Sequence, residues 1–194
     1  MNKAVYLIGS LALLPGVAFA QDAAVTSAPV AGNSWALALA LLGCAMATAL
    51  PCFGSAMGVS GVGQSGAGLL TEKPDLAGKV ITLAVLPGSQ GLYGMVISLL
   101  FLFSFGPSVL DGSIALSFTD GLALFAAFIP VAITCLSSAP YQGKVCSAGM
   151  HMLARDGRLA GRVITLAALV ETYALLGFLI SFFMLNALKA GMLS

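Results

Sequence analysis

Glu171 is the one carboxylate of this chain that lies inside a long apolar segment. The 194-residue sequence has seven Asp and Glu residues, and the other six fall in the N-terminal region or in polar joints. Glu171 follows Arg162 by nine residues, or about 14 Å along a helix, close to the middle of a hydrocarbon core about 30 Å thick. An ionised group at that depth costs on the order of a few kcal/mol, so it indicates a function. The alternative is a protonated Glu that joins helices by a hydrogen bond.

Polar residues that could complete a site with Glu171 lie in two other apolar segments. One stretch reads Leu86-Pro87-Gly88-Ser89-Gln90-Gly91-Leu92-Tyr93-Gly94, and Gln142 lies within the third segment. Pro87 has no N–H, so a carbonyl one turn back lacks its helical partner, and such carbonyls are tolerated in membranes where they line a site. Carboxylate, amide, hydroxyl and carbonyl oxygens suit hard cations. One carboxylate is neutralised by one monovalent cation, which favours Na⁺ or H⁺. For Gln90 and Gln142 the alternative is hydrogen bonding between helices.

The composition indicates that these residues belong to a membrane protein. Hydrophobic residues make up 59% of the chain and charged residues 8%, whereas a soluble domain has about 25% charged residues. The net charge of +1 gives no basic field for nucleic acid, which excludes a nucleic-acid binder. A spanning helix takes about 20 residues, so four or five spans leave no room for a soluble catalytic domain.

The Gly-rich stretch 58–63 is not a phosphate loop, because it lacks the preceding strand and the Lys of that motif. We therefore expect no enzyme and no cofactor.

The apolar segments predict the domain organisation. They run roughly over residues 35–70, 78–105, 121–154 and 162–190. Residues 1–20 combine Lys3, an apolar run and Ala18-Phe19-Ala20, which is typical of a secretory signal peptide; an uncleaved extra helix is the alternative. We expect a flexible segment at 21–34, a first helical hairpin at 35–106, an external loop at 107–120 and a second hairpin at 121–194.

Basic residues predict the orientation of the hairpins. Those in or beside the first and third joints are Lys73, Lys79, Arg155, Arg158 and Arg162. The middle joint has only the acidic residues Asp111 and Asp120. Because Lys and Arg concentrate in cytoplasmic loops, we expect the first and third joints in the cytoplasm and the mature termini outside. The protein is then a multi-pass protein of the cell (inner) membrane.

The two hairpins repeat one sequence pattern at a distance of 83 residues, without a gap. Residues 77–84 (AGKVITLA) align with residues 160–167 (AGRVITLA), and Ser55 aligns with Ser138. Gly88 aligns with Glu171, so the first hairpin lacks the acid. A repeat of this length is a supersecondary unit that needs neighbours to bury its face. The sequence thus predicts an all-α membrane protein with four transmembrane helices, built as two tandem duplicated hairpins. The small residues of the first segment should allow close helix packing.

At the polar positions the sequence resembles a known family. The stretches Leu86–Gly94, Gln142-Gly143-Lys144-Val145 and Val170-Glu171-Thr172-Tyr173-Ala174 look like the proteolipid subunit K of bacterial V-type ATPases. The similarity covers about residues 35–190. The resemblance implies a non-catalytic subunit of a V/A-type ATPase or ATP synthase. It also implies that identical copies form a membrane ring, which turns against a stator and carries ions across the membrane.

The resemblance also implies site residues and partners. In the Na⁺-transporting members the matching positions hold the ion, which implies Glu171, Gln90, Ser89, Gln142 and the backbone carbonyl of Leu86 as ligands. Tyr93 matches the Tyr that hydrogen-bonds the Glu. Ser89 stands where Thr is usual, so it keeps the hydroxyl and loses a methyl group. The implied partners are lipid, a stator membrane subunit with an Arg, and a central-stalk subunit at residues 71–77 and 155–160.

Two other functions remain open from the sequence. One is an H⁺-carrying rotor ring of the same type. The other is a small four-helix cation channel or transporter that is unrelated to a rotary ATPase. The oxygen-rich surroundings of Glu171 favour Na⁺.

Overall fold

The computed structural model describes residues 34–193 apart from residues 105 and 112. The signal peptide predicted at 1–20 lies outside the described residues, as does the predicted flexible segment apart from Ser34. Four helical stretches of the described chain are long and apolar enough to cross a membrane. They are Ser34–Glu72, Pro74–Ser104, Phe118–Arg155 and Gly157–Met192. They match the four segments expected from the sequence and confirm the all-α class.

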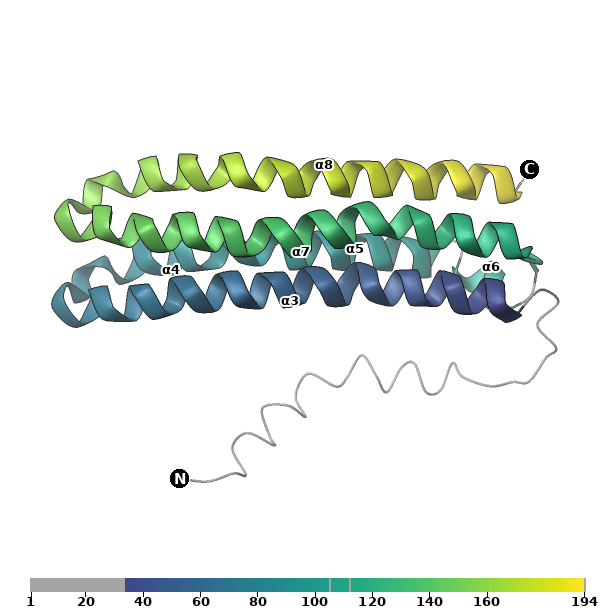
Figure 1. The fold of residues 1–194 in the computed structure, drawn as a ribbon, viewed down its shortest axis with the longest axis horizontal. Helices are drawn as coiled ribbons and strands as arrows, with labels where there is room; N and C mark the ends of the chain where they lie inside the picture. The colour runs from purple at the N-terminus through teal and green to yellow at the C-terminus, as the bar shows by residue number, and fades with distance from the viewer. Residues whose placement is uncertain (1–33, 105, 112, 194) are drawn as a thin grey trace, which may run out of the picture. The chain divides into compact units, whose positions relative to one another are not determined.

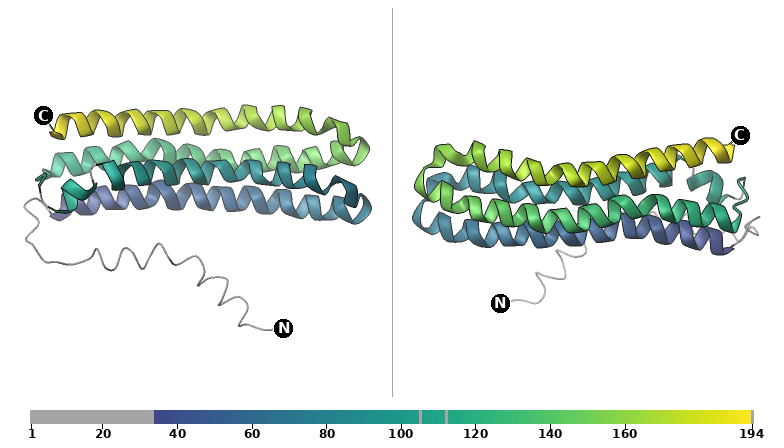
Figure 2. Two further views of the ribbon diagram at one scale, coloured as in Figure 1. Left: turned by 180° about the vertical axis from the view of Figure 1, so that it is seen from behind. Right: turned by 45° about the horizontal axis from the view of Figure 1, so that its top comes forward.

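The described residues form two long hairpins in series. The first hairpin comprises α3 (Ser34–Glu72), η1 (Pro74–Leu76), α4 (Ala77–Val85), η2 (Leu86–Gly88) and α5 (Ser89–Ser104). After α6 (Gly106–Leu110), the second hairpin comprises α7 (Phe118–Arg155), η3 (Gly157–Leu159) and α8 (Ala160–Leu193). Within the hairpins, α3 packs on α5 and α7 packs on α8. The two hairpins contact each other mainly through α3 and α7 (Figures 1 and 2). Both hairpin turns lie at one end of the bundle, and α6 lies at the other (Figure 1).

The connection between the hairpins contains more helix than the sequence suggested. The segment 107–120 was expected to be a loop, but most of α6 lies within it and α7 begins at Phe118. Ser117 caps α7, because its hydroxyl accepts a hydrogen bond from the N–H of Asp120 at 3.2 Å. The Asp120 carboxylate in turn accepts from the N–H of Ser117 at 2.9 Å. This reciprocal capping box satisfies two N–H groups that would otherwise lack partners, and its residues lie within a stretch that looks polar and irregular in sequence.

Small residues let α3 and α7 approach closely, as the sequence predicted. A Cβ atom added to Gly54 would lie 2.6 Å from the carbonyl oxygen of Leu136, and one added to Gly58 would lie 2.5 Å from that of Ala139. A Cβ atom cannot come this near to a carbonyl oxygen, so these two positions require glycine. Gly63 and Gly68 of the same helix face open space instead. The close packing therefore depends on particular glycines rather than on the whole Gly-rich run.

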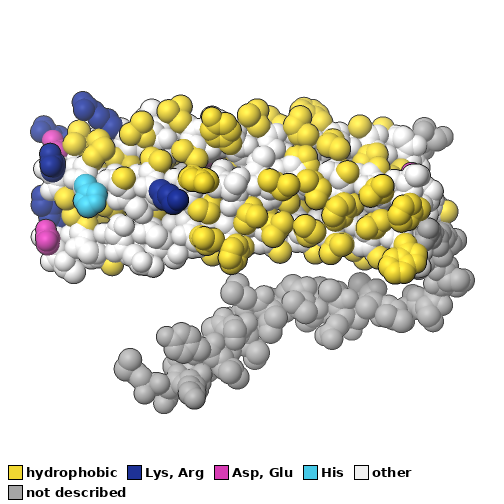
Figure 3. Space-filling view, viewed as in Figure 1, with side chains coloured by type: hydrophobic (Ala, Val, Ile, Leu, Met, Phe, Trp, Pro, Cys, Tyr) yellow, Lys and Arg dark blue, Asp and Glu magenta, His cyan; other side chains and the backbone are white. Residues whose placement is uncertain are grey.

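Charged side chains gather at the end where the hairpins turn (Figure 3). The Lys73 ammonium donates a hydrogen bond to the carbonyl of Ala154 and so links the two turns. Arg158 pairs with Asp156 at 2.9 Å. Hydrogen bonds from Arg158, together with the charges of Lys79 and Lys73, hold the pKa of the Asp156 carboxyl below its ordinary value. The helices between the two ends of the bundle present a long apolar surface instead, which is typical of a protein surrounded by lipid.

Candidate functional site

A break in the second membrane-crossing stretch positions the polar residues of the site. Helix α4 ends at Val85, the 3₁₀ turn η2 carries Pro87, and α5 begins at Ser89. The backbone N–H of Gly91, in the first turn of α5, donates to the hydroxyl of Ser55 on α3 at 2.8 Å. Pro87 has no N–H and interrupts the α-helical hydrogen bonds, and Ser55 gives a partner to a buried N–H in the turn that follows the break.

Glu171, on the uninterrupted helix α8, receives hydrogen bonds from both sides of its carboxylate. Its Oε1 accepts from the hydroxyl of Ser89 at 2.7 Å and from the hydroxyl of Tyr93 at 2.6 Å. Its Oε2 lies 3.5 Å from Nε2 of Gln142. Two of these donors belong to the first hairpin and one to α7, so the site exists only where the two hairpins meet.

The two glutamines form the deepest part of the site. Gln90 and Gln142 are both fully buried, with 0% of their surface exposed. Gln90 donates through Nε2 to Oε1 of Gln142 at 2.6 Å, and Gln142 donates through Nε2 to the carbonyl of Ala167 at 3.1 Å. Buried amides must have partners, so this chain of hydrogen bonds fixes the orientation of both side chains beside Glu171.

The carbonyl of Leu86 completes the oxygen-rich cluster. Its oxygen lies 2.9 Å from the Ser89 hydroxyl, within hydrogen-bond distance, and Oε1 of Gln90 lies 3.4 Å from the same hydroxyl. The structure therefore brings together all the positions predicted from the sequence: Glu171, Gln90, Ser89, Gln142, Tyr93 and the Leu86 carbonyl. The one ion pair within the described residues joins Arg158 and Asp156. Glu171 consequently has hydroxyl and amide partners but no cationic one in that part of the chain.

Two residues that lie near the site were not predicted from the sequence. Ser55 supports the break at Pro87, and Phe178 of α8 packs its ring against that of Tyr93 with centroids 5.6 Å apart. Nothing in the local sequence marks Phe178. Ser55 could have been found from the repeat, because its counterpart Ser138 is also a serine within a membrane-crossing helix. The Ser138 hydroxyl is buried and has no hydrogen-bond partner among the described residues.

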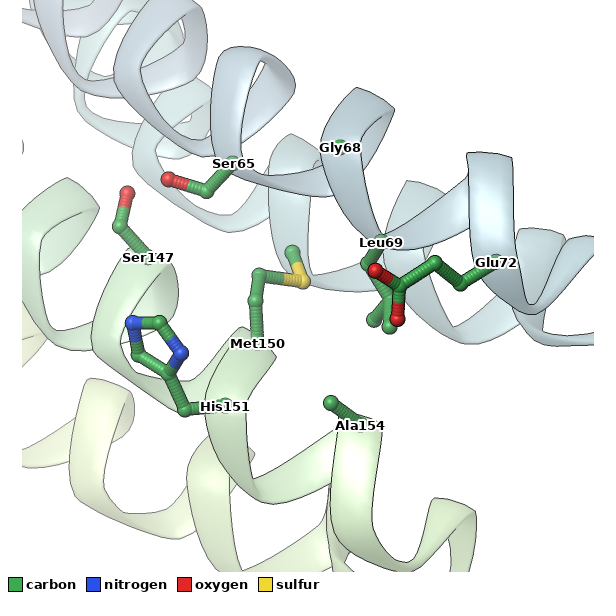
Figure 4. Close-up of a pocket in the computed structure, with 8 residues that line it drawn as sticks. All are labelled: Ser65, Gly68, Leu69, Glu72, Ser147, Met150, His151 and Ala154. Carbon is green, nitrogen blue, oxygen red and sulfur yellow. The ribbon is translucent and has the colours of Figure 1, made fainter.

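A separate hollow lies near the hairpin turns, between α3 and α7. It has a volume of about 320 Å³. Its lining comprises Ser65, Gly68, Leu69, Glu72, Ser147, Met150, His151 and Ala154 (Figure 4). The described residues contain no group of three or more His, Cys, Asp or Glu side chains that could hold a metal ion. Glu72 and His151 therefore give this hollow a polar rim without the ligand set of a metal centre.

Comparisons with known proteins agree with the duplicated architecture. The family of the ATP synthase C subunit matches the chain twice, over residues 42–101 and 125–184. The starts of the two matches, 42 and 125, differ by 83 residues, as do their ends, 101 and 184. This difference equals the spacing of the internal repeat.

Individual relatives cover most of the chain. It is 42% identical over 152 residues to the V-type sodium ATPase subunit K of Enterococcus hirae, a match that spans 78% of this chain and 93% of the relative. It is 33% identical over 155 residues to the A-type ATP synthase subunit K of Methanocaldococcus jannaschii, spanning 80% of this chain and 65% of the relative. It is 28% identical to the c' subunit of the V-type proton ATPase of Saccharomyces cerevisiae, over 72% of this chain and 82% of the relative.

Proposed function

The chain belongs to the ATP synthase C-subunit family as a V-type ATPase proteolipid, a non-catalytic subunit of a membrane rotor ring, and on that premise we propose that it carries Na⁺ on Glu171. The observation that carries the proposal is the pair of hydroxyls, from Ser89 and Tyr93, that converge on one oxygen of a carboxylate in a membrane-crossing helix. A carboxylate placed this way has its position fixed before any ion arrives. It can accept a cation without rearrangement of the backbone.

Oxygen atoms near Glu171 support Na⁺ as the transported ion. The Ser89 hydroxyl, the Leu86 carbonyl and the side-chain oxygen of Gln90 lie in one hydrogen-bonded cluster with the carboxylate. Gln142 adds a further amide. A hard monovalent cation favours such ligands, whereas a proton needs only the carboxyl group. The Enterococcus hirae relative is named as a sodium ATPase subunit. A ring that carries H⁺ is the alternative, as the name of the Saccharomyces cerevisiae relative illustrates.

Coupling to rotation follows from the cost of placing charge in lipid. With its cation bound, Glu171 is neutral and can pass through the apolar interior of the membrane. Without the cation, the bare carboxylate cannot re-enter lipid, because an isolated charge there is strongly unfavourable. A stator subunit with a positively charged Arg would favour release of the ion at one point of the turn. Rotation then proceeds in the direction that reloads the site.

The charged end of the bundle is the proposed contact with the rest of the motor. We place the hairpin turns in the cytoplasm and the termini outside, since the basic residues concentrate at the turns. Residues 71–77 and 155–160 are then available to a central-stalk subunit. The hydrogen bond from Lys73 to Ala154 holds the two turns together, so that stalk would meet a single continuous surface on each copy.

Ion transport by variants of the intact complex tests the proposal. Glu171→Gln keeps the size of the side chain but removes its charge, so ATP-driven ²²Na⁺ uptake into vesicles should be abolished. Asp111→Asn removes an acidic charge at an exposed position in the connection between the hairpins, and it should leave uptake unchanged. Uptake that persists in Glu171→Gln would contradict the proposal. ATP-driven acidification without any Na⁺ requirement would assign the ring to H⁺.

A further inference from the structure

An open hollow lies between α7 and α8. It has a volume of about 330 Å³. Its lining comprises Thr134, Ser137, Ser138, Tyr141, Val170 and Tyr173, which we call the socket. The rings at its rim are largely uncovered, with 61% of Tyr141 and 65% of Tyr173 exposed. The buried Ser138 hydroxyl has no partner among the described residues. Exposed aromatic rings at the rim of a hollow provide apolar surface against which another membrane helix can pack.

The internal repeat gives the occupied version of the same surface. Subtracting 83 from each socket residue gives Pro51, Gly54, Ser55, Gly58, Pro87 and Gln90. All six of these residues are buried. They form the surface of the first hairpin that receives the second hairpin, because Gly54 lies against Leu136 and Gly58 against Ala139. The socket is therefore the second hairpin's copy of a surface already shown to bind a hairpin.

The same subtraction identifies what should enter the socket. Leu136, Ala139 and Gly143 of α7 cover the occupied surface, and their counterparts are Phe53, Ala56 and Ser60 of α3. All three counterparts are exposed. Phe53 is the largest of them, with 63% of its surface exposed. One chain thus presents a free socket on its second hairpin and a free apolar projection on its first.

We propose that Phe53 of a neighbouring copy enters the socket formed by α7 and α8. A contact between different surfaces of identical chains can be repeated from copy to copy, and it closes into a ring when the rotation permits. The proposal uses the ring assembly on which the proposed function rests, but it is independent of the transported ion. It assigns a residue-level contact to each interface between copies.

The residue differences between the two surfaces fit this contact. Ser137 stands where the occupied surface has Gly54, and a Cβ atom at Gly54 would lie 2.6 Å from the backbone of Leu136. The backbones at the interface between copies must therefore lie farther apart than α3 and α7 do within one copy. Phe53 is the counterpart of Leu136, whose backbone lies against Gly54, and the large side chain of Phe53 can span the wider gap. A larger projection is thus matched to a wider socket.

The repeat also explains why the interface between copies would hold no ion. The contact between Glu171 and Ser89 within a chain corresponds, between copies, to a contact between Gly88 and Thr172. The contact between Gln142 and Gln90 corresponds to one between Val59 and Tyr173. The acid and both amides are replaced by residues that cannot neutralise a cation. Tyr173 fills the position of a ligand with an aromatic ring, so each copy carries one ion site.

Photo-crosslinking of the intact complex in its membrane tests the contact. A benzophenone-bearing phenylalanine in place of Phe53 should join two copies, with adducts in residues 134–141 or 170–173. Phe103 is the matched control, because it is 78% exposed and its counterpart Asn186 is exposed as well. The repeat therefore places Phe103 on neither contact surface, and the same probe there should yield lipid adducts. A probe at Tyr141 should reach residues 53–60 of a neighbour.

The outcomes separate this inference from the proposed function. Phe53 adducts confined to lipid, or to residues outside the socket, in complexes whose rings remain intact on native gels would overturn the contact. If the Phe53 probe prevents assembly, the Tyr141 probe makes the same test from the other side. Ser137→Trp fills the socket and should lower the Phe53 crosslink several-fold; an unchanged yield would also overturn it. Absence of any ring in the unmodified complex would contradict the rotor function instead.

Discussion

The hydroxyl of Ser55 accepts a hydrogen bond from the backbone N–H of Gly91 at 2.8 Å, across the interface between α3 and α5. Gly91 follows directly after Gln90, and Ser89 precedes it in the same turn. The bond therefore anchors the first turn of α5, which carries the site residues Ser89 and Gln90. In the second hairpin α8 runs without a break, and the hydroxyl of Ser138, the counterpart of Ser55, has no hydrogen-bond partner among the described residues.

Ser55→Ala should weaken Na⁺ binding although Ser55 does not touch Glu171. The substitution leaves the buried N–H of Gly91 without a partner, at a cost of about 1–3 kcal/mol. If most of this cost falls on the bound state, the Na⁺ affinity drops about tenfold. Isothermal titration of purified rings would measure the affinity. Ser138→Ala is the matched control and should bind Na⁺ as the unmodified ring does. Equal affinities in all three rings would contradict the role of Ser55.

Ser89→Ala should reduce the Na⁺ affinity more than Tyr93→Phe does. Each substitution removes one hydrogen bond to Oε1 of Glu171, worth about 1 kcal/mol. Ser89→Ala also removes a hydroxyl oxygen that lies within reach of the Leu86 carbonyl and is a proposed ligand. Direct ²²Na⁺ binding to the two rings would give the order of affinities. A reversed order would show that Tyr93, rather than Ser89, supplies the main interaction with the occupied carboxylate.

Gly54→Ala should destabilise the chain, whereas Gly63→Ala should not. A Cβ atom at Gly54 would meet the backbone of Leu136 at 2.6 Å, and a contact this close forces helices apart at a cost of about 1–3 kcal/mol. At Gly63 nothing lies within 4 Å, and Ala is the better helix former by about 1 kcal/mol. Thermal unfolding in detergent would compare the two. A Gly54→Ala protein as stable as Gly63→Ala would contradict the close approach of α3 and α7.

Much of this architecture follows from the sequence because the relevant signals are strong there. Four long apolar segments predict four spans, and a gapless repeat predicts two hairpins. The single carboxylate at Glu171 and the Pro87 break both mark positions that are costly in a membrane. Glu171 and Pro87 are informative because a membrane tolerates such residues only where other groups compensate for them.

Other features depend on three-dimensional contacts that no local pattern reveals. Gly54 and Gly63 look alike in sequence, yet only Gly54 faces a helix backbone. Phe178 belongs to an apolar run and becomes relevant because its ring meets Tyr93. Helix α6 is five residues long, too short to leave a periodic pattern. The partner of the Ser55 hydroxyl could be inferred only after the break at Pro87 was placed against α3.

Carbodiimide labelling of Glu171, measured across pH with and without Na⁺, tests the central claim most directly. The reagent attacks a protonated carboxyl group in an apolar environment, so an ion bound at Glu171 must compete with it. We expect labelling of Glu171 in the intact complex and protection by millimolar Na⁺, with less protection as the pH falls. Labelling that Na⁺ does not change at any pH would contradict Na⁺ binding and identify a proton carrier. A Glu171 that never labels would contradict its role as the exchangeable acid of the rotor.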